Sequence, residues 1–564
     1  MSSDTGGKAT SNPTPGNPQP NPQSAPDLPN RQAVVIIHGI GEQVPMATLR
    51  GFVNSVWVTD EDLIDAEKRD GDTGEKPRRR NPIWTKPDRR NRSFELRRIT
   101  TERDKMGVRT DFYEFYWAHL MHGTTLQQVW AWIAALFLRP YHKVPSDVVL
   151  AWLFGWALTL GFLAIAGLIY FLKPEWWASI MAALGIAVVA TGLGLARSAI
   201  RGTLVNVAGD VVRYVEAKPT NVARRQEIRE QGVQLLETLM GIDPESLAAN
   251  EKRVEEGEQP VWKPKYRRIV VVGHSLGSIV GYDLLKHTFA RVHKHPLMQK
   301  RPQPARRRLE TYCRLTCNNS RWTFNQDTFR RLQRAAFEEL REHGSPWVIS
   351  DFVTLGAALT HLEFLMAEDT HDAHRQQFER ILPTCPPTME WDRHTHKDHF
   401  SYRTKFDGFD GDGAKAREGK RSDRAHFRYP HHAAHFAFTR WTNLHSPSHK
   451  VLWGDLVSGP ISEQFGLRDR RTSGPDAAVL PGAKDVKVLD HKGDEGTPKA
   501  TFTHLDYWNL NAMQQPGIPP RPRWLTNGER IPDKHVPHHI RELRKALDLL
   551  FKEDKPKRDD DLFR

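Results

Sequence analysis

A single serine lies at the centre of the five-residue segment Gly273-His274-Ser275-Leu276-Gly277. β-Branched residues precede this segment and an apolar helical pattern follows it, so we expect a strand, a sharp turn and a helix, with Ser275 at the apex. Gly273 and Gly277 suit such a turn because larger side chains would clash there. The helix N-terminus behind the serine, with the free N–H of Leu276, would stabilise a developing oxyanion. The segment therefore predicts a nucleophilic serine, and the alternative is a plain glycine-rich connection between a strand and a helix.

A second glycine-containing segment lies near the N-terminus. Residues 33–37 form a short apolar run that ends in His38-Gly39-Ile40-Gly41. Together with the serine segment, it resembles the oxyanion loop and nucleophile turn of the α/β-hydrolase superfamily, specifically of the lipase and esterase branch. The resemblance implies an α/β fold with a mostly parallel sheet and helices on both faces. It also implies an oxyanion hole formed by the N–H of Leu276 with that of Ile40 or Gly41. Another strand-to-turn junction is the alternative for this segment.

A serine hydroxyl needs a base, and the base needs an acid that orients it. The resemblance implies that the acid and then a histidine follow the serine along the chain. Asp455 matches the acid position because it lies in a loop after a predicted strand at 436–444. His504 matches the base because it lies beyond a last predicted strand at 486–490, three residues before a tyrosine. The alternatives are Asp469 and Asp490 for the acid and His491 for the base.

The remaining histidines and cysteines do not predict a metal site or a cofactor. The cysteines Cys313 and Cys317 are four residues apart, but no matching pair completes a zinc site, so we expect them to be structural. A polar region at 370–435 carries several histidines without carboxylates at a recognisable ligand spacing, which favours solvated loop residues. These histidines are His394, His396, His399, His431, His432 and His435.

The net charge of +13 over 564 residues indicates an anionic partner. Basic residues cluster at 76–109 and 300–334, and both nucleic acid and an anionic membrane surface could bind them. Nucleic acid is not expected, because the basic stretches lack the interleaved aromatic residues of a binding platform. Residues 1–30 are polar and contain no apolar signal-peptide core, so the catalytic domain is expected in a reducing, cytoplasmic setting.

Two long uncharged runs, at 148–172 and 176–196, predict a transmembrane hairpin. Each exceeds the roughly 20 apolar residues that cross a bilayer, and Tyr170, Trp176 and Trp177 would serve as interfacial anchors. Basic residues flank the pair on both outer sides, which predicts that both chain termini and the catalytic domain are cytoplasmic, at a bacterial inner membrane. The bilayer would then be a partner. A buried pair of helices is the alternative.

Other patterned segments are expected to build the scaffold. Strands are predicted at 94–100, 111–117 and 347–356, and Asp351 inside the last of these is expected to be structural. A polar helix is expected at 204–239. The predicted organisation is a disordered tail (1–30), the first part of an α/β-hydrolase domain (31–145), the hairpin (146–200), the rest of that domain (201–545) with lid-like insertions at 291–345 and 370–435, and a charged tail (546–564).

The resulting functional hypothesis is a membrane-anchored serine hydrolase that cleaves carboxylic esters with Ser275, His504 and Asp455. The substrate would be an ester, most readily of a lipid, because a membrane-bound enzyme meets lipid acyl chains at high local concentration. Two alternatives stay open: a thioesterase or protein deacylase with the same residues, and a non-catalytic membrane scaffold. The sequence indicates no oligomeric state.

Overall fold

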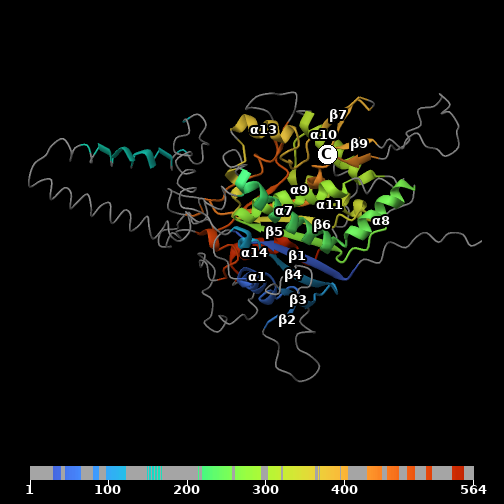
Figure 1. Cartoon of the computed structure of the whole chain (residues 1–564), viewed down its shortest axis with the longest axis horizontal. Coiled ribbons are helices and arrows are strands. Elements are labelled where there is room, and N and C mark those ends of the chain that lie inside the picture. The colour runs from blue at the N-terminus through green and yellow to red at the C-terminus, as the bar shows by residue number, and fades with distance from the viewer. Residues whose placement is uncertain are drawn as a thin grey trace, which may run out of the picture.

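The structure is a computed structural model of the whole chain (Figure 1). It describes residues 29–39, 45–64, 80–87, 97–121, selected positions from 141 to 167, 214, 219–256, 261–293, 303–318, 322–361, 366–367, 369–393, 395–403, 428–447, 454–455, 457–468, 479–489, 503–510 and 536–551.

The centre of the molecule is an eight-stranded sheet in the order β14-β11-β6-β5-β1-β4-β3-β2. Neighbouring strands from β14 to β4 pair in parallel, and β3 and β2 add an antiparallel edge. The strands are β1 (Arg31–Ile37), β2 (Ile83–Pro87), β3 (Arg97–Arg103), β4 (Arg109–Phe115), β5 (Arg268–His274), β6 (Ile349–Leu355), β11 (Arg440–His445) and β14 (Lys484–Lys487). The predicted α/β class, with a mostly parallel sheet, is confirmed.

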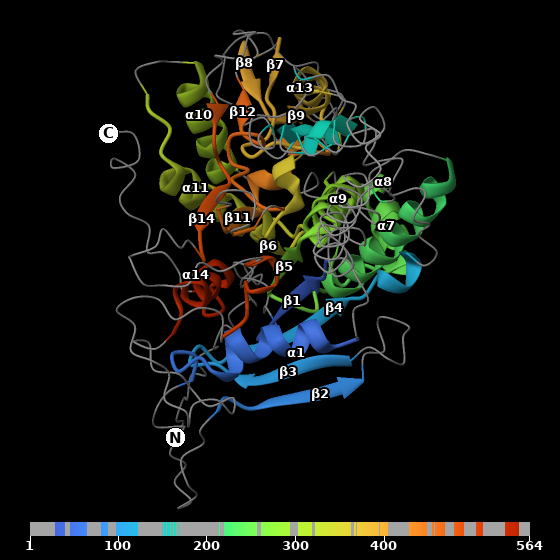
Figure 2. The ribbon, with the colours of Figure 1, turned by 90° about the vertical axis from the view of Figure 1, so that its left-hand side faces the viewer.

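Helices cover both faces of this sheet (Figures 1 and 2). The α-helices are α1 (Ala47–Val53), α7 (Pro219–Met240), α8 (Pro244–Glu255), α9 (Leu276–Val292), α10 (Pro304–Asn318), α11 (Gln326–Glu342), α13 (Thr370–Phe378) and α14 (His538–Leu547). The π-helix η1 (Asn54–Val58) continues α1, and single 3-10 turns are η2 (Ala118–Met121), η6 (Ala358–His361), η8 (His435–Ala437) and η9 (Thr503–Leu505). Small two-stranded sheets contain β7 (Glu390–Asp392), β8 (Lys397–His399), β9 (Ser401–Arg403), β10 (Arg428–Pro430), β12 (Leu467–Arg468) and β13 (Val479–Leu480).

Side-chain alternation along the buried strands divides the apolar interior into two cores. In β1, Val35 and Ile37 pack with α7, α9 and α11, whereas Val34 and Ile36 pack with α1 and α14. A strand covered on both faces is apolar at nearly every position, because successive side chains point to opposite sides. This explains why β1 and β5 were recognisable as uninterrupted apolar runs.

Most predicted elements are present with shifted ends. The helix expected at 204–239 is described as α7, and the strand expected at 436–444 begins only at Arg440 because η8 occupies 435–437. The predicted last strand at 486–490 is β14, which begins two residues earlier and ends three residues earlier. The described part of the first insertion contains the helices α10 and α11.

The prediction of solvated histidines in the second insertion is wrong at two positions. The described part of this insertion contains α13 and the strands β7 to β10, and Figure 2 shows α13, β7, β8 and β9 gathered at the end of the molecule opposite β2 and β3. His431 and His435 are buried, and burial lowers the pKa of His431 to about 3. A neutral imidazole is apolar enough to pack in a core, so polar composition alone misjudged these residues. No group of potential metal ligands forms among the described residues.

The prediction of a two-span membrane protein is wrong. No helix within the described ranges combines the length and the apolar character needed to cross a bilayer. The structure describes residues 148–172 only in part, and 176–196 lie outside the described residues. The inferred membrane location and orientation are therefore withdrawn.

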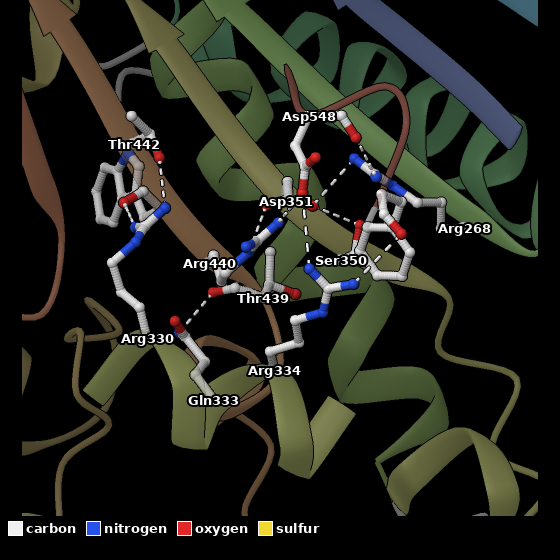
Figure 3. A network of polar contacts seen from close by, with 12 residues as sticks. Arg268, Arg330, Gln333, Arg334, Ser350, Asp351, Thr439, Arg440, Thr442 and Asp548 are labelled. Carbon is white, nitrogen blue, oxygen red and sulfur yellow. Dashed lines mark hydrogen bonds and ion pairs between the residues drawn. The ribbon is translucent and has the colours of Figure 1, made fainter. Parts of the chain in front are cut away.

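A buried ion network anchors the C-terminal end of the described chain to the sheet. The guanidinium groups of Arg268, Arg334 and Arg440 turn toward Asp351 and Asp548 (Figure 3). Arg440 Nε and Arg268 Nη2 lie 2.8 and 3.3 Å from the Asp351 carboxylate, and Arg268 also donates to the carbonyls of Leu547 and Asp548. Asp351 is thus structural, as expected, because its charge neutralises arginines at the start of β5 and β11.

Candidate active site

Ser275 occupies a strained turn between β5 and α9. Its backbone angles are φ 54° and ψ −127°, a conformation that residues other than glycine rarely adopt, and it is 2% exposed. A Cβ at Gly277 would lie 2.2 Å from the carbonyl oxygen of Ile37, and one at Gly273 would lie 2.7 Å from that of Gly277. Glycine is therefore required at both positions, because the backbone of α9 contacts β1 and β5 directly. The predicted strand, turn and helix are present.

His504 and Asp455 lie together as the sequence predicted. His504 Nδ1 is 2.9 Å from Asp455 Oδ2, and Asp455 also accepts hydrogen bonds from the Tyr507 hydroxyl at 2.8 Å and the Val457 N–H at 2.9 Å. Burial alone would raise the pKa of Asp455, but His504, Tyr507 and Val457 together lower it to about 2. The carboxylate is consequently ionised at neutral pH, and it keeps the proton of His504 on Nδ1.

The pair lies beside the serine turn. Gly356, directly after β6, would place a Cβ 3.1 Å from Asp455 Oδ2 and 3.2 Å from His504 Nδ1. The Ser275 N–H donates to the carbonyl of Leu355 at 3.0 Å, which joins the turn to the same end of β6. The carboxyl ends of β5 and β6 therefore bring the three residues together, at the sheet edge where parallel α/β folds bind ligands.

His504 Nε2 is the atom of this arrangement that could accept a proton from a nucleophile. It is buried and has no hydrogen-bond partner among the described residues. With the proton on Nδ1, Nε2 carries a lone pair and can accept a proton from a hydroxyl. Hydrogen bonds between a nucleophile and its base are often long before substrate binds, so the free Nε2 is compatible with a base for Ser275.

The predicted oxyanion elements are described only in part. Leu276 is the first residue of α9, and a Cβ at Gly39 would lie 2.8 Å from the Ser275 Cβ, so the end of β1 reaches the serine. His38 is fixed there by hydrogen bonds from the N–H and the indole of Trp117, at 3.3 and 3.1 Å. Ile40 and Gly41 lie outside the described residues, as do the alternatives Asp469, Asp490 and His491.

Three residues make contacts that the sequence did not predict, and one of them, His274, was expected only as part of the serine turn. Tyr507, whose spacing from His504 was visible, supports the acid, and His274 contacts the base. Glu114, near the end of β4, accepts a hydrogen bond at 2.8 Å from the N–H of Met46, directly before α1. No sequence signal marks Glu114, because a carboxylate in a strand gives no indication of burial.

Burial raises the pKa of Glu114 from 4.5 to about 7, which predicts a pH-dependent stability. The folded chain holds this proton more tightly than the unfolded chain. The stability that the proton confers is complete below about pH 4.5 and is lost as the pH rises through about 7. Glu114→Gln removes this loss, so urea unfolding at pH 8 should show a gain of about 1–3 kcal/mol over wild type, and little gain at pH 4.5.

The control for this prediction is Glu342→Gln, at the exposed end of α11, which should leave the pH dependence unchanged. If Glu114→Gln and wild type lost the same free energy of unfolding between pH 4.5 and 8, Glu114 would not be the group responsible.

Comparisons of the chain with protein-family models, with curated proteins and with solved structures found no match.

Proposed function

We propose that this chain is a serine hydrolase that cleaves carboxylic esters through an acyl-enzyme intermediate. The observation that carries the proposal is the Asp455–His504 pair, whose free Nε2 lies in the same site as a serine on a strained strand-to-helix turn. The resemblance to the lipase and esterase branch of the α/β-hydrolase superfamily agrees with the order of these residues along the chain. It also agrees with the central position of β5 in the sheet.

In the proposed reaction, Ser275 Oγ attacks the ester carbonyl while His504 Nε2 takes its proton. The oxyanion that forms is stabilised by the N–H of Leu276, at the positive end of the α9 dipole. His504 returns the proton to the departing alcohol, which leaves the acyl group on Ser275. Water then repeats the sequence, with His504 again taking and returning a proton, and releases the acid. Asp455 stays ionised throughout and stabilises the imidazolium.

The expectation of a lipid substrate rested on the membrane location, which the structure contradicts. The proposal therefore extends to carboxylic esters in general. A thioesterase would use the same residues, so the two activities are separated by the relative rates on matched esters and thioesters.

The proposal is tested by the turnover of p-nitrophenyl esters and matched acyl thioesters by wild type and Ser275→Ala. Removal of the nucleophile should lower kcat by about 10⁴-fold or more, with an unchanged melting temperature. The matched control is Ser462→Ala, a half-buried serine between β11 and β12, which should turn over like wild type. Equal rates for Ser275→Ala and wild type would refute the serine mechanism. A folded wild-type chain without turnover on either substrate class would favour a non-catalytic scaffold.

A further inference from the structure

His274, the last residue of β5, lies between the nucleophile turn and the proposed base. Its ring centroid is 5.0 Å from that of His504 and 4.8 Å from that of Trp508, which meets it edge-on at 83°. On another side, a Cβ at Gly39 would lie 3.2 Å from His274 Nδ1. The imidazole is thus packed against two segments of the site, residues 503–510 and the end of β1, and has little freedom to rotate.

The ring makes a hydrogen bond to the main chain of the base itself. His274 Nε2 lies 2.8 Å from the carbonyl oxygen of His504, and a carbonyl can only accept, so Nε2 carries the proton. Burial, with a smaller contribution from His504, lowers the pKa of His274 to about 3. The imidazole is neutral at any pH at which the proposed hydrolase would work, so this hydrogen bond persists across that range.

The hydrogen bond from His274 adds a third contact that holds the segment around His504 in place. Asp455 holds the ring at Nδ1, and the carbonyl of Trp508, four residues further on, accepts a hydrogen bond of 2.5 Å from Ser55 Oγ. Neither contact links His504 to the strand that carries the serine. The bond from His274 does, because His274 and Ser275 are adjacent in the chain.

We propose that His274 is a positioning residue of the proposed hydrolase: its Nε2–H fixes the main chain of His504 to the strand of Ser275 and so sets the approach of His504 Nε2 to Ser275 Oγ. This inference rests on the proposed function. Displacement of a reacting group by about 1 Å can cost about 10²-fold in rate, so loss of the bond should be visible in kcat.

Two amide substitutions separate this hydrogen bond from packing. The terminal nitrogen of Gln reaches the position of a histidine Nε2, whereas that of Asn, one methylene shorter, reaches only the position of Nδ1. We expect His274→Asn to lower kcat by about 10²-fold with KM changed less than about threefold, and His274→Gln to recover at least about tenfold of that loss. The rate of Ser275 labelling by a fluorophosphonate should follow the same order. Melting temperatures of both variants identify any general loss of folding.

Equal kcat values for the Asn and Gln variants, whether both low or both like wild type, would overturn the positioning role. Ser275→Ala in the same assay distinguishes a failure of the proposed function from a failure of the proposed role of His274. If it retained turnover, the proposed function would fail. If it abolished turnover while His274→Asn stayed like wild type, only the role of His274 would fail.

Imidazole nitrogen-15 NMR tests the hydrogen bond in the wild-type chain, so the result does not depend on whether a variant folds. The signals of residue 274 should show a neutral ring protonated at Nε2 from roughly pH 5 to 9. A proton on Nδ1, or a charged ring, would contradict the hydrogen bond.

Discussion

Replacement of Asp455 by Asn should lower kcat by about 10⁴-fold with little effect on substrate binding. Asp455 Oδ2 accepts from both His504 Nδ1 and the Tyr507 hydroxyl, and Oδ1 accepts from the Val457 N–H. An asparagine NH₂ group at either position would face N–H or O–H donors. The imidazole would then move its proton to Nε2 or turn away, and in both cases the base is lost. Steady-state kinetics on a p-nitrophenyl ester measures the effect.

The matched control is Asp506→Asn, two residues after His504. The Asp506 carboxylate accepts a hydrogen bond from the Asn509 side chain, and no hydrogen bond is described between it and the acid or the base, so kcat should stay within about twofold. A loss below about tenfold in Asp455→Asn would mean that this carboxylate does not orient the base.

Replacement of Asp351 by Asn should lower the free energy of unfolding by about 3 kcal/mol. Its carboxylate is 2% exposed and neutralises Arg268, whose side chain is fully buried, together with Arg440. Burial alone would raise the pKa of Asp351, but Arg440 and Arg268 lower it, so the group is an anion at neutral pH. Without this anion, the buried guanidinium of Arg268 and the 14% exposed Arg440 lose their closest counter-charge. Urea unfolding at pH 7 measures the change.

Asp548→Asn in the same network (Figure 3) is the matched control, because Asp548 is 29% exposed and lies 3.5 and 3.7 Å from Arg440 and Arg334. Solvent screens these two ion pairs, so their loss should cost less than about 1 kcal/mol. Equal destabilisation by the two substitutions would show that burial does not set the strength of these ion pairs.

The sequence predicted the central part of the fold because its signals are local. In residues 268–292 an uninterrupted apolar strand meets a turn that requires two glycines, and a helix follows immediately. The roles of Ser275, Asp455 and His504 were likewise predicted from short local patterns and from their order along the chain. The structure brings these segments to one end of the sheet through parallel pairing, which no local pattern encodes.

Several features that the sequence did not predict depend on burial or on contacts between distant segments. The polar composition of 370–435 indicated solvent exposure, yet His431 and His435 are core residues. The uncharged run at 148–172 satisfied a length rule for membrane spans, but no helix within the described ranges is long and apolar enough to cross a bilayer. The hydrogen bonds of Tyr507 and His274 join residues from different segments, so only the folded chain reveals them.

The proposed mechanism requires that Ser275 forms a covalent acyl intermediate. The most direct measurement is mass spectrometry of the intact chain, quenched in acid during turnover of a p-nitrophenyl ester. We expect one added acyl group, located on Ser275 by peptide mapping and absent from Ser275→Ala. An acyl group on another residue, or ester turnover by Ser275→Ala at the wild-type rate, would contradict it.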